Sequence, residues 1–94
     1  MDYWKVDWRH EFQSEPIRFY SEIGDDGYEV RKIQEYRDGR KLKADESHEA
    51  GEIGLSEIPV GPIEDVNRQA EFSAVVISRE DFEKEWQGAD WSSN

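Results

Sequence analysis

A run near the start of the chain alternates large apolar residues with charged ones. Trp4, Val6 and Trp8 occupy every second position, and charged residues fill the positions between them. Because successive side chains of a β-strand point to opposite faces, this alternation predicts a strand that is buried on one side. A domain of 94 residues that holds such a strand must cover its apolar face with a second layer of structure.

More extended runs follow, separated by turn residues. Residues 17–23 and 28–36 are rich in β-branched and aromatic side chains, and residues 41–44 are predicted to return as a short fourth strand. Gly-Asp-Asp-Gly at 24–27 predicts a turn between the first two of these runs. The Asp-Gly pair within 37–40 predicts a hairpin with a type I′ turn.

The run at 28–36 has an irregular pattern. Tyr28 and Val30 share one face, but Ile33 falls out of phase with them. An extra residue in one strand of an antiparallel pair shifts the alternation by one position. A β-bulge near Arg31 and Lys32 would restore the alternation; the alternative is that both faces of this strand are partly covered.

The second half of the chain changes character. Residues 45–62 are polar and interrupted by Gly and Pro, which predicts a long loop with a short extended piece at 55–58. Pro62 begins a short predicted helix over 62–69. The apolar run at 71–78 indicates a central strand, and Ser78 is placed to cap a helix over 79–87.

Together these elements predict an α+β fold. We expect an antiparallel β-meander of about four to five strands, with the C-terminal helix packed on one face and a second short helix. Phe82 and Trp86 are expected to pack from that helix against Trp4, Val6 and Phe19. The boundaries predict a single domain over residues 1–88 and a frayed tail over residues 89–94, unless Trp91 docks onto the domain.

The composition of the chain limits the cellular compartment and the kinds of catalysis that we expect for this protein. The chain has no cysteine, which excludes disulfides and thiolate catalysis. No apolar stretch approaches the roughly 20 residues of a membrane span, and no signal peptide is apparent. We expect a cytoplasmic protein without membrane association, and we expect it to be folded because 13% of its residues are aromatic.

The net charge of −11 favours a positively charged partner. Acidity also confers solubility, and that simpler explanation stays open. Exposed aromatic side chains are typical interface anchors, and Tyr3, Tyr20 and Tyr36 are candidates for that role. The candidate partner-binding carboxylates lie in the 24–27 turn and in the long loop: Asp25, Asp26, Asp45, Glu46, Glu49 and Glu52.

One segment, residues 31–43, opposes the overall charge with six basic and two acidic side chains. Arg37, Arg40, Lys41 and Lys43 flank the predicted hairpin tip and are expected to stand in solvent. Charged side chains commonly keep an exposed strand from pairing with a neighbouring molecule, and this role is the favoured explanation. The alternative is a patch that binds a small ligand or nucleic acid, although the net charge argues against nucleic acid. The basic patch comprises Arg31, Lys32, Arg37, Arg40, Lys41 and Lys43.

No catalytic or metal-binding signature stands out. His10 follows the first strand, and His48 lies among acidic residues of the long loop. Either histidine could serve as a general base, but carboxylates are so frequent here that their proximity carries little weight. The pattern around His48 lacks the helical pair of histidines of a zinc motif. We therefore expect no cofactor, no metal and no enzymatic activity.

Several motifs resemble a family of small acidic bacterial domains of unknown function. They are Tyr-Trp-x-Val-x-Trp-x-His at 3–10, Glu-Pro-Ile at 15–17, Gly-Tyr-Glu-Val-Arg-Lys at 27–32, Arg-Asp-Gly at 37–39 and Phe-Glu-x-x-Trp at 82–86. The resemblance implies that some members are encoded near polymorphic toxins. It transfers no functional residue to this chain.

The sequence thus favours a non-catalytic protein-binding module. The hypothesis is an immunity protein whose acidic surface neutralises a cationic bacterial toxin. The alternative is a small ligand- or nucleic-acid-binding domain that uses the basic segment 31–43.

Overall fold

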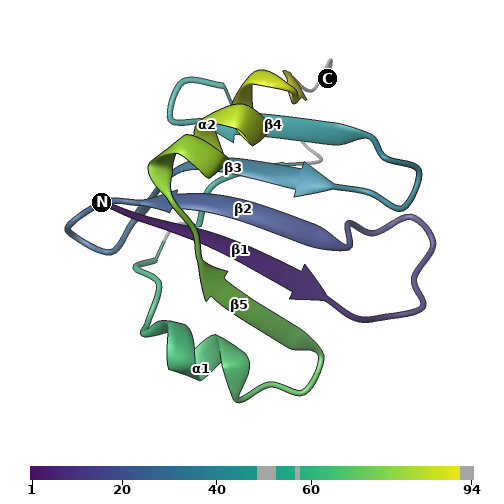
Figure 1. Ribbon diagram of the computed structural model, residues 1–94, viewed down its shortest axis with the longest axis horizontal. Coiled ribbons are helices and arrows are strands. Elements are labelled where there is room, and N and C mark those ends of the chain that lie inside the picture. The colour runs from purple at the N-terminus through teal and green to yellow at the C-terminus, as the bar shows by residue number, and fades with distance from the viewer. Residues whose placement is uncertain (49–52, 57, 92–94) are drawn as a thin grey trace.

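One twisted six-stranded sheet organises the molecule, with a helix on each face. A computed structural model describes residues 1–48, 53–56 and 58–91 of the chain. The strand order is β5-β1-β2-β3-β4-β6, and all neighbours are antiparallel except the last pair (Figure 1). The elements in chain order are β1 Asp2–Trp8, β2 Arg18–Ile23, β3 Glu29–Glu35, β4 Lys41–Asp45, α1 Ile63–Asn67, β5 Phe72–Val76, α2 Arg79–Gln87 and β6 Asp90–Trp91. The predicted α+β class and the helix packed on the sheet are confirmed.

Glycine shapes the two turns that join β2 to β3 and β3 to β4. Gly27 and Gly39 take φ angles of 86° and 90°, a region that favours glycine. In the second turn the Gly39 amide donates to the Tyr36 carbonyl at 3.0 Å. A type I′ turn requires positive φ at both central residues, and Asp38 does not have it. The predicted hairpin is therefore present, but the predicted turn type is wrong.

A bulge in β3 sets which side chains share a face. Glu22 of β2 pairs with Arg31, whereas the next residue, Ile23, pairs with Glu29. Val30 is thus the extra residue, and the irregularity lies just before the expected position at Arg31 and Lys32.

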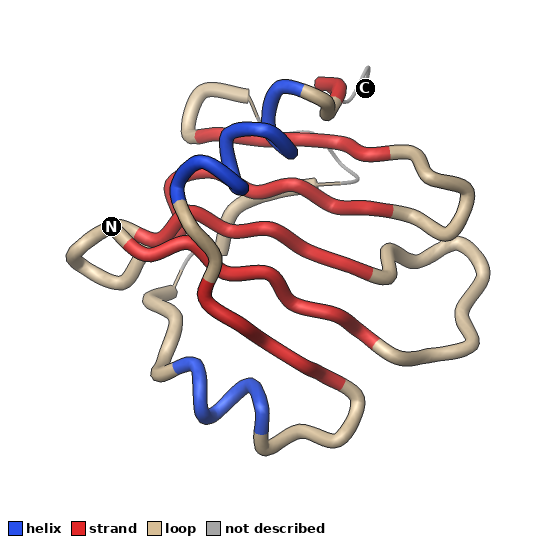
Figure 2. Tube along the Cα trace, viewed as in Figure 1, coloured by secondary structure: helices blue, strands red, loops and turns tan. Residues whose placement is uncertain are grey.

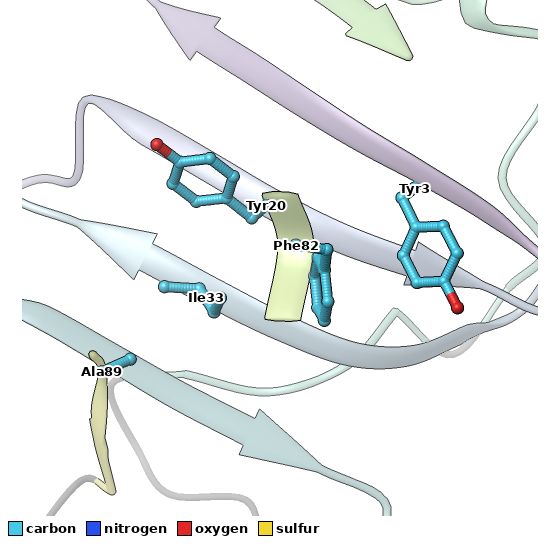
Figure 3. Close-up of a cluster of buried hydrophobic side chains, with 5 residues drawn as sticks. All are labelled: Tyr3, Tyr20, Ile33, Phe82 and Ala89. Carbon is cyan, nitrogen blue, oxygen red and sulfur yellow. The ribbon is translucent and has the colours of Figure 1, made fainter. Parts of the chain in front are cut away.

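The α2 helix covers one face of the sheet. The Ser78 side chain accepts a hydrogen bond from the Asp81 amide at 3.0 Å, as expected for a cap. Phe82 is fully buried at the centre of this layer. Figure 3 shows Phe82 projecting between two tyrosine rings of the sheet. The buried cluster comprises Tyr3, Tyr20, Ile33, Phe82 and Ala89.

This layer corrects two expectations. Trp4 and Val6 belong to a cluster on the opposite face, against which Phe19 also packs, so none of the three packs against α2 as expected. Because β1 is buried on both faces, alternation alone could not identify the side that α2 covers. The expected surface tyrosines, Tyr3, Tyr20 and Tyr36, are all at most 9% exposed and are core residues.

The second face packs against α1 and the chain before it. Ile63 and Val66 of α1 contact the cluster formed by Trp4, Val6 and its neighbours, as their helical spacing predicts. Further along the sheet, Ile53 of the long loop is 2% exposed and packs near Leu42 and Ala44. The loop is thus anchored at residue 53, and within the expected extended piece at 55–58 the Ser56 amide donates to the Glu29 carboxylate at 2.7 Å. Residue 57 of that piece lies outside the described residues.

The strand β5 lies at an edge of the sheet and not at its centre. It pairs with β1 on one side, and Val75 and Val76 are more than half exposed. The outer side of β5 is held by Asn67 of α1. The Asn67 amide donates to the Ala74 carbonyl at 2.9 Å and accepts from the Ala74 amide at 2.7 Å. A side chain therefore occupies the place of a neighbouring strand at this point.

The residues after α2 return to the sheet. Ala89 is buried, and Asp90 and Trp91 form the short strand β6 beside β4. The expectation of a frayed tail is thus wrong for residues 89–91, because the Trp91 ring packs against Trp86 and His48. Residues 92–94 lie outside the described part of the chain. No helix within the described ranges is long and apolar enough to cross a membrane.

Candidate partner-binding site

The antiparallel order brings the acidic candidates to one end of the sheet. Asp25 and Asp26 lie in the turn after β2, and Asp45 and Glu46 lie at the end of β4. Since β2 and β4 run in the same direction, both pairs lie at the same end of the sheet, where the turn after β2 lies beside the N-terminus in Figure 2. The other two candidates, Glu49 and Glu52, lie outside the described residues.

Two further carboxylates join this end, which we call the acidic end. Asp2 begins β1, and Glu80 lies in the first turn of α2. Both side chains are exposed. Sequence reasoning did not select them, although the strand order would have placed Asp2 beside the turn after β2. The acidic end comprises Asp2, Asp25, Asp26, Asp45, Glu46 and Glu80.

Two of these carboxylates have a lowered pKa. The hydrogen bond and charge of the Met1 amino group, 2.8 Å away, lower the pKa of the exposed Asp25 carboxyl. Burial acts to raise the pKa of Asp45. Hydrogen bonds from the His48 ring and the Ser47 amide outweigh burial, so the pKa of Asp45 is lowered overall. Both groups carry a negative charge at neutral pH.

A groove of about 500 Å³ opens at the acidic end. Trp4 and Ile23 of the sheet form part of its wall, and Ile63 of α1 and Val76 of β5 add further apolar surface. The carboxylates of Asp2 and Asp25 line the same groove. Apolar surface beside exposed charge is the usual anatomy of a protein interface.

The groove wall is fixed to the turn after β2. The Val60 amide donates to the Gly27 carbonyl at 2.8 Å, and Val60 also lines the groove. The chain leading into α1 is thereby tied to the turn that carries Asp25 and Asp26. The apolar and acidic parts of the groove are thus held together by the backbone.

A second pocket, of about 270 Å³, lies between the sheet and α1, and we call it the sheet pocket. It shares Trp4, Ile23 and Val60 with the groove. Its remaining walls are mostly apolar, but one side is polar and includes Ser21, Glu29 and Lys32.

The basic residues of segment 31–43 do not form one patch. Arg31 is held between two carboxylates, Glu22 at 2.6 Å and Glu83 at 2.8 Å. Its guanidinium also lies 4.8 Å from the centre of the Phe82 ring. The charge-assisted bonds to Glu83 and Glu22 raise the pKa of Arg31. Lys32, the next residue, points to the opposite face, into the sheet pocket.

The other basic side chains of the segment also lie in two different places, beneath α2 and at the hairpin tip. Lys41 pairs with Glu85 of α2, and Lys43 donates to the Trp86 carbonyl at 3.1 Å. These two lysines are half-buried beneath α2, so the expectation that they stand in solvent is wrong. Arg37 and Arg40 are exposed at the hairpin tip, roughly 20 Å along the strand from Arg31.

Both histidines have structural contacts. The ring of His10 bridges the β1–β2 loop, with Nε2 lying 2.8 Å from the Pro16 carbonyl and Nδ1 accepting from the Phe12 amide at 2.9 Å. The ring of His48 contacts Asp45 and lies 4.4 Å from the Trp91 ring, centre to centre, in a tilted arrangement. Within the ranges that the structure describes, no group of three or more His, Asp or Glu side chains is arranged to hold a metal ion.

These features define a small α+β domain with an acidic, apolar-walled groove at one end of its sheet. The chain belongs to the family described as "Domain of unknown function (DUF6881)", which it matches over residues 2–90. The resemblance to a family of small domains of unknown function is confirmed. No curated protein matches the chain. No solved structure matches it either.

Proposed function

We propose that this domain is a non-catalytic protein-binding module that recognises a cationic protein. The observation that supports this most strongly is the groove at the acidic end. It combines apolar walls with the exposed carboxylates of Asp2 and Asp25. Lysine and arginine side chains fit such a groove, because their alkyl stems cover apolar surface while their charged ends reach carboxylates.

The surrounding charge supports fast association. Four separate segments contribute six carboxylates to the acidic end, of which one, Asp25, pairs with the Met1 amino group. Arg31 and Lys41 are neutralised by carboxylates within the fold. A surface of one sign steers a partner of the opposite sign and raises the association rate constant. The exposed Val76, beside the groove, adds apolar area that contact with a partner would bury.

The sequence resemblance supports one class of partner. It implies that related domains are encoded near polymorphic toxins, so we propose an immunity protein that blocks a cationic toxin. A toxin site built to hold phosphate groups would accept the carboxylates of Asp25 and Asp26. The basic segment gives less support to nucleic-acid binding, because its side chains are divided between two faces and a distant hairpin tip.

The experiment compares two variants with the same change in net charge. The first carries Asp2→Asn, Asp25→Asn and Asp26→Asn at the acidic end. The control carries Glu11→Gln, Glu15→Gln and Glu71→Gln, which are exposed at the opposite end of the sheet. A partner is captured from the native host with the unaltered protein, and its association kinetics are then measured with all three proteins.

We expect the acidic-end variant to associate at least about tenfold more slowly, and the control to retain most of its rate. Raising the salt concentration should slow association of the unaltered protein more than it speeds dissociation. Equal losses in both variants would show that net charge alone matters. An association rate that does not depend on salt would contradict electrostatic recognition.

A further inference from the structure

The bulge in β3 places two opposite charges on one wall of the sheet pocket. Residues three apart on a regular strand point to opposite faces. The extra residue Val30 removes this difference, so Glu29 and Lys32 both point into the pocket. Bulges often re-aim a side chain beside a functional site.

The Glu29 side chain is buried, with 7% of its surface exposed, and neighbouring groups hold its carboxylate in place. One carboxylate oxygen accepts from the Ser21 hydroxyl at 3.0 Å, and the other accepts from the Ser56 amide at 2.7 Å. The Lys32 ammonium lies 3.2 Å from the second oxygen. Residues from β2, β3 and the long loop therefore converge on this one carboxylate.

Lys32 keeps hydrogen-bonding capacity toward the pocket. Its ammonium group has three N–H donors. Among the described residues it contacts the Glu29 carboxylate and the Gly54 carbonyl, the latter at 3.3 Å. It also lies 5.8 Å from the centre of the Phe19 ring, another wall of the pocket. Among the described residues, one donor thus has no partner and can serve a molecule inside the pocket.

Stability alone does not account for this pair. Replacing a buried ion pair with apolar residues of similar volume is often neutral or stabilising, because both charges must be desolvated. The same sheet face is otherwise packed with apolar side chains such as Val6 and Ile23. A positioned charge pair in an apolar pocket is instead typical of ligand sites, in which a few polar groups fix orientation.

We infer that the sheet pocket binds a compact, uncharged aromatic molecule with one hydrogen-bond acceptor, which receives a bond from Lys32. Phe19 and Phe72 offer aromatic walls, and Trp4 lies between the sheet pocket and the groove. Cavities of about 150 Å³ accommodate benzene, so about 270 Å³ suits a molecule of one substituted ring.

The charge pair selects against ions. An anion that approached Lys32 would also meet the Glu29 carboxylate, and the net charge of −11 adds to its repulsion. A cation would meet the Lys32 ammonium. A neutral acceptor such as a phenol oxygen avoids both costs.

The test uses the isolated chain and three matched probes: 4-ethylphenol, 4-ethyltoluene, which lacks the hydroxyl, and 4-ethylbenzoate, which is an anion at neutral pH. Binding is followed by changes in the backbone amide spectrum, at residues that line the pocket and at residues on the α2 face. We expect saturable binding of 4-ethylphenol with changes at Ser21, Lys32 and Phe72. The hydrocarbon should bind about tenfold more weakly, as one lost hydrogen bond to a charged group predicts.

A paired substitution tests the role of the ion pair. The variant Glu29→Gln with Lys32→Met removes both charges and leaves no buried charge unpaired, and a dispersed amide spectrum shows that it folds. The control is Glu85→Gln with Lys41→Met, which removes an ion pair from the other face of the sheet. We expect the first variant to lose the preference for 4-ethylphenol over 4-ethyltoluene, and the control to keep it.

Three results would overturn the inference. They are no saturable change with any probe, equal affinity for 4-ethylphenol and 4-ethyltoluene, and tighter binding of 4-ethylbenzoate. None of them depends on a protein partner, so this test is independent of the proposed function.

Discussion

Arg31 and Glu83, which are 52 residues apart in the chain, form a two-pronged ion pair that joins β3 to α2. The Arg31 Nη1 donates to one carboxylate oxygen at 2.8 Å, and Nη2 donates to the other at 3.0 Å. The same guanidinium binds Glu22 of β2, whose side chain is 8% exposed. Part of the basic segment in this acidic chain therefore serves to attach the helix to the sheet.

The first prediction concerns the loss of this connection. Arg31→Met keeps much of the side-chain volume but leaves Glu22 with an uncompensated charge. We expect the free energy of unfolding to fall by about 2 to 3 kcal/mol, because removing one partner of a buried pair leaves the other desolvated. Urea unfolding followed by tryptophan fluorescence measures this change.

The control for that variant is Arg79→Met. Arg79 lies 3.9 Å from the same Glu83, but its side chain is 76% exposed. Exposed pairs contribute little, so this change should stay within about 0.5 kcal/mol. A similar loss in both variants would show that general charge balance, and not the buried pair, sets the stability.

The second prediction is the pH dependence of this ion pair. Hydrogen bonds from Arg31 lower the pKa of Glu22 and of Glu83 in the folded state. A carboxyl with a lowered folded pKa stabilises the fold above its unfolded pKa, here near 4.5, and loses that effect as pH falls through the folded value. The stability gap between the unaltered protein and Arg31→Met should therefore be full at pH 7 and shrink below about pH 4.

Denaturant titrations at several pH values measure that gap. Arg79→Met again serves as the control, and its curve should run parallel to that of the unaltered protein. A gap that stays constant down to about pH 3 would show that Arg31 stabilises the fold through packing on Phe82 and not through its charge.

The sequence predicted the strands well because their alternation is local. The pattern of Trp4, Val6 and Trp8 places these side chains on one face, and the structure agrees. The alternation in the sequence could not show which face of the sheet α2 covers, because Tyr3 and Trp4 are equally buried on opposite sides of β1. That choice depends on contacts with Phe82, nearly 80 residues away.

The apolar composition of β5 led to a wrong prediction of its place in the sheet. Residues 71–78 suggested a central strand, but Val75 and Val76 are exposed at an edge. Asn67 covers the outer side of this strand with one side chain, which no sequence period reveals. The groove and the sheet pocket were missed for a related reason, since both depend on the path of the chain before α1.

The third prediction tests the contact between Asn67 and Ala74. Asn67→Ala removes two hydrogen bonds and exposes the edge of β5. We expect a loss of about 1 to 2 kcal/mol and a new tendency to associate at high concentration, because an open strand edge can pair with another chain. Urea unfolding and analytical ultracentrifugation measure the two effects.

The control here is Arg68→Gln, on the residue that follows α1, where the side chain is 78% exposed and pairs only with Asp65 among the described contacts. It should change neither stability nor association. If Asn67→Ala loses stability but stays monomeric at all concentrations, the side chain anchors α1 without protecting the edge.

The last prediction separates two glycines of nearly equal φ. Gly39→Ala introduces a methyl group with nothing within 4 Å, so its cost should be only the strain of a left-handed alanine, about 1 kcal/mol. Gly27→Ala carries the same strain, and its methyl group would also lie 3.3 Å from the Pro59 Cβ. Because the Gly27 carbonyl also accepts from the Val60 amide, Pro59 cannot shift without disturbing the groove wall.

We therefore expect Gly27→Ala to cost about 2 kcal/mol or more, and Gly39→Ala to cost about half as much. Thermal and urea unfolding of the two variants measure the difference. The groove provides a second measurement, since Gly27→Ala should also weaken binding of a cationic partner while Gly39→Ala leaves it unchanged. Equal costs would mean that the segment around Pro59 yields freely, and the groove at the acidic end would then lack the rigid wall on which partner recognition depends.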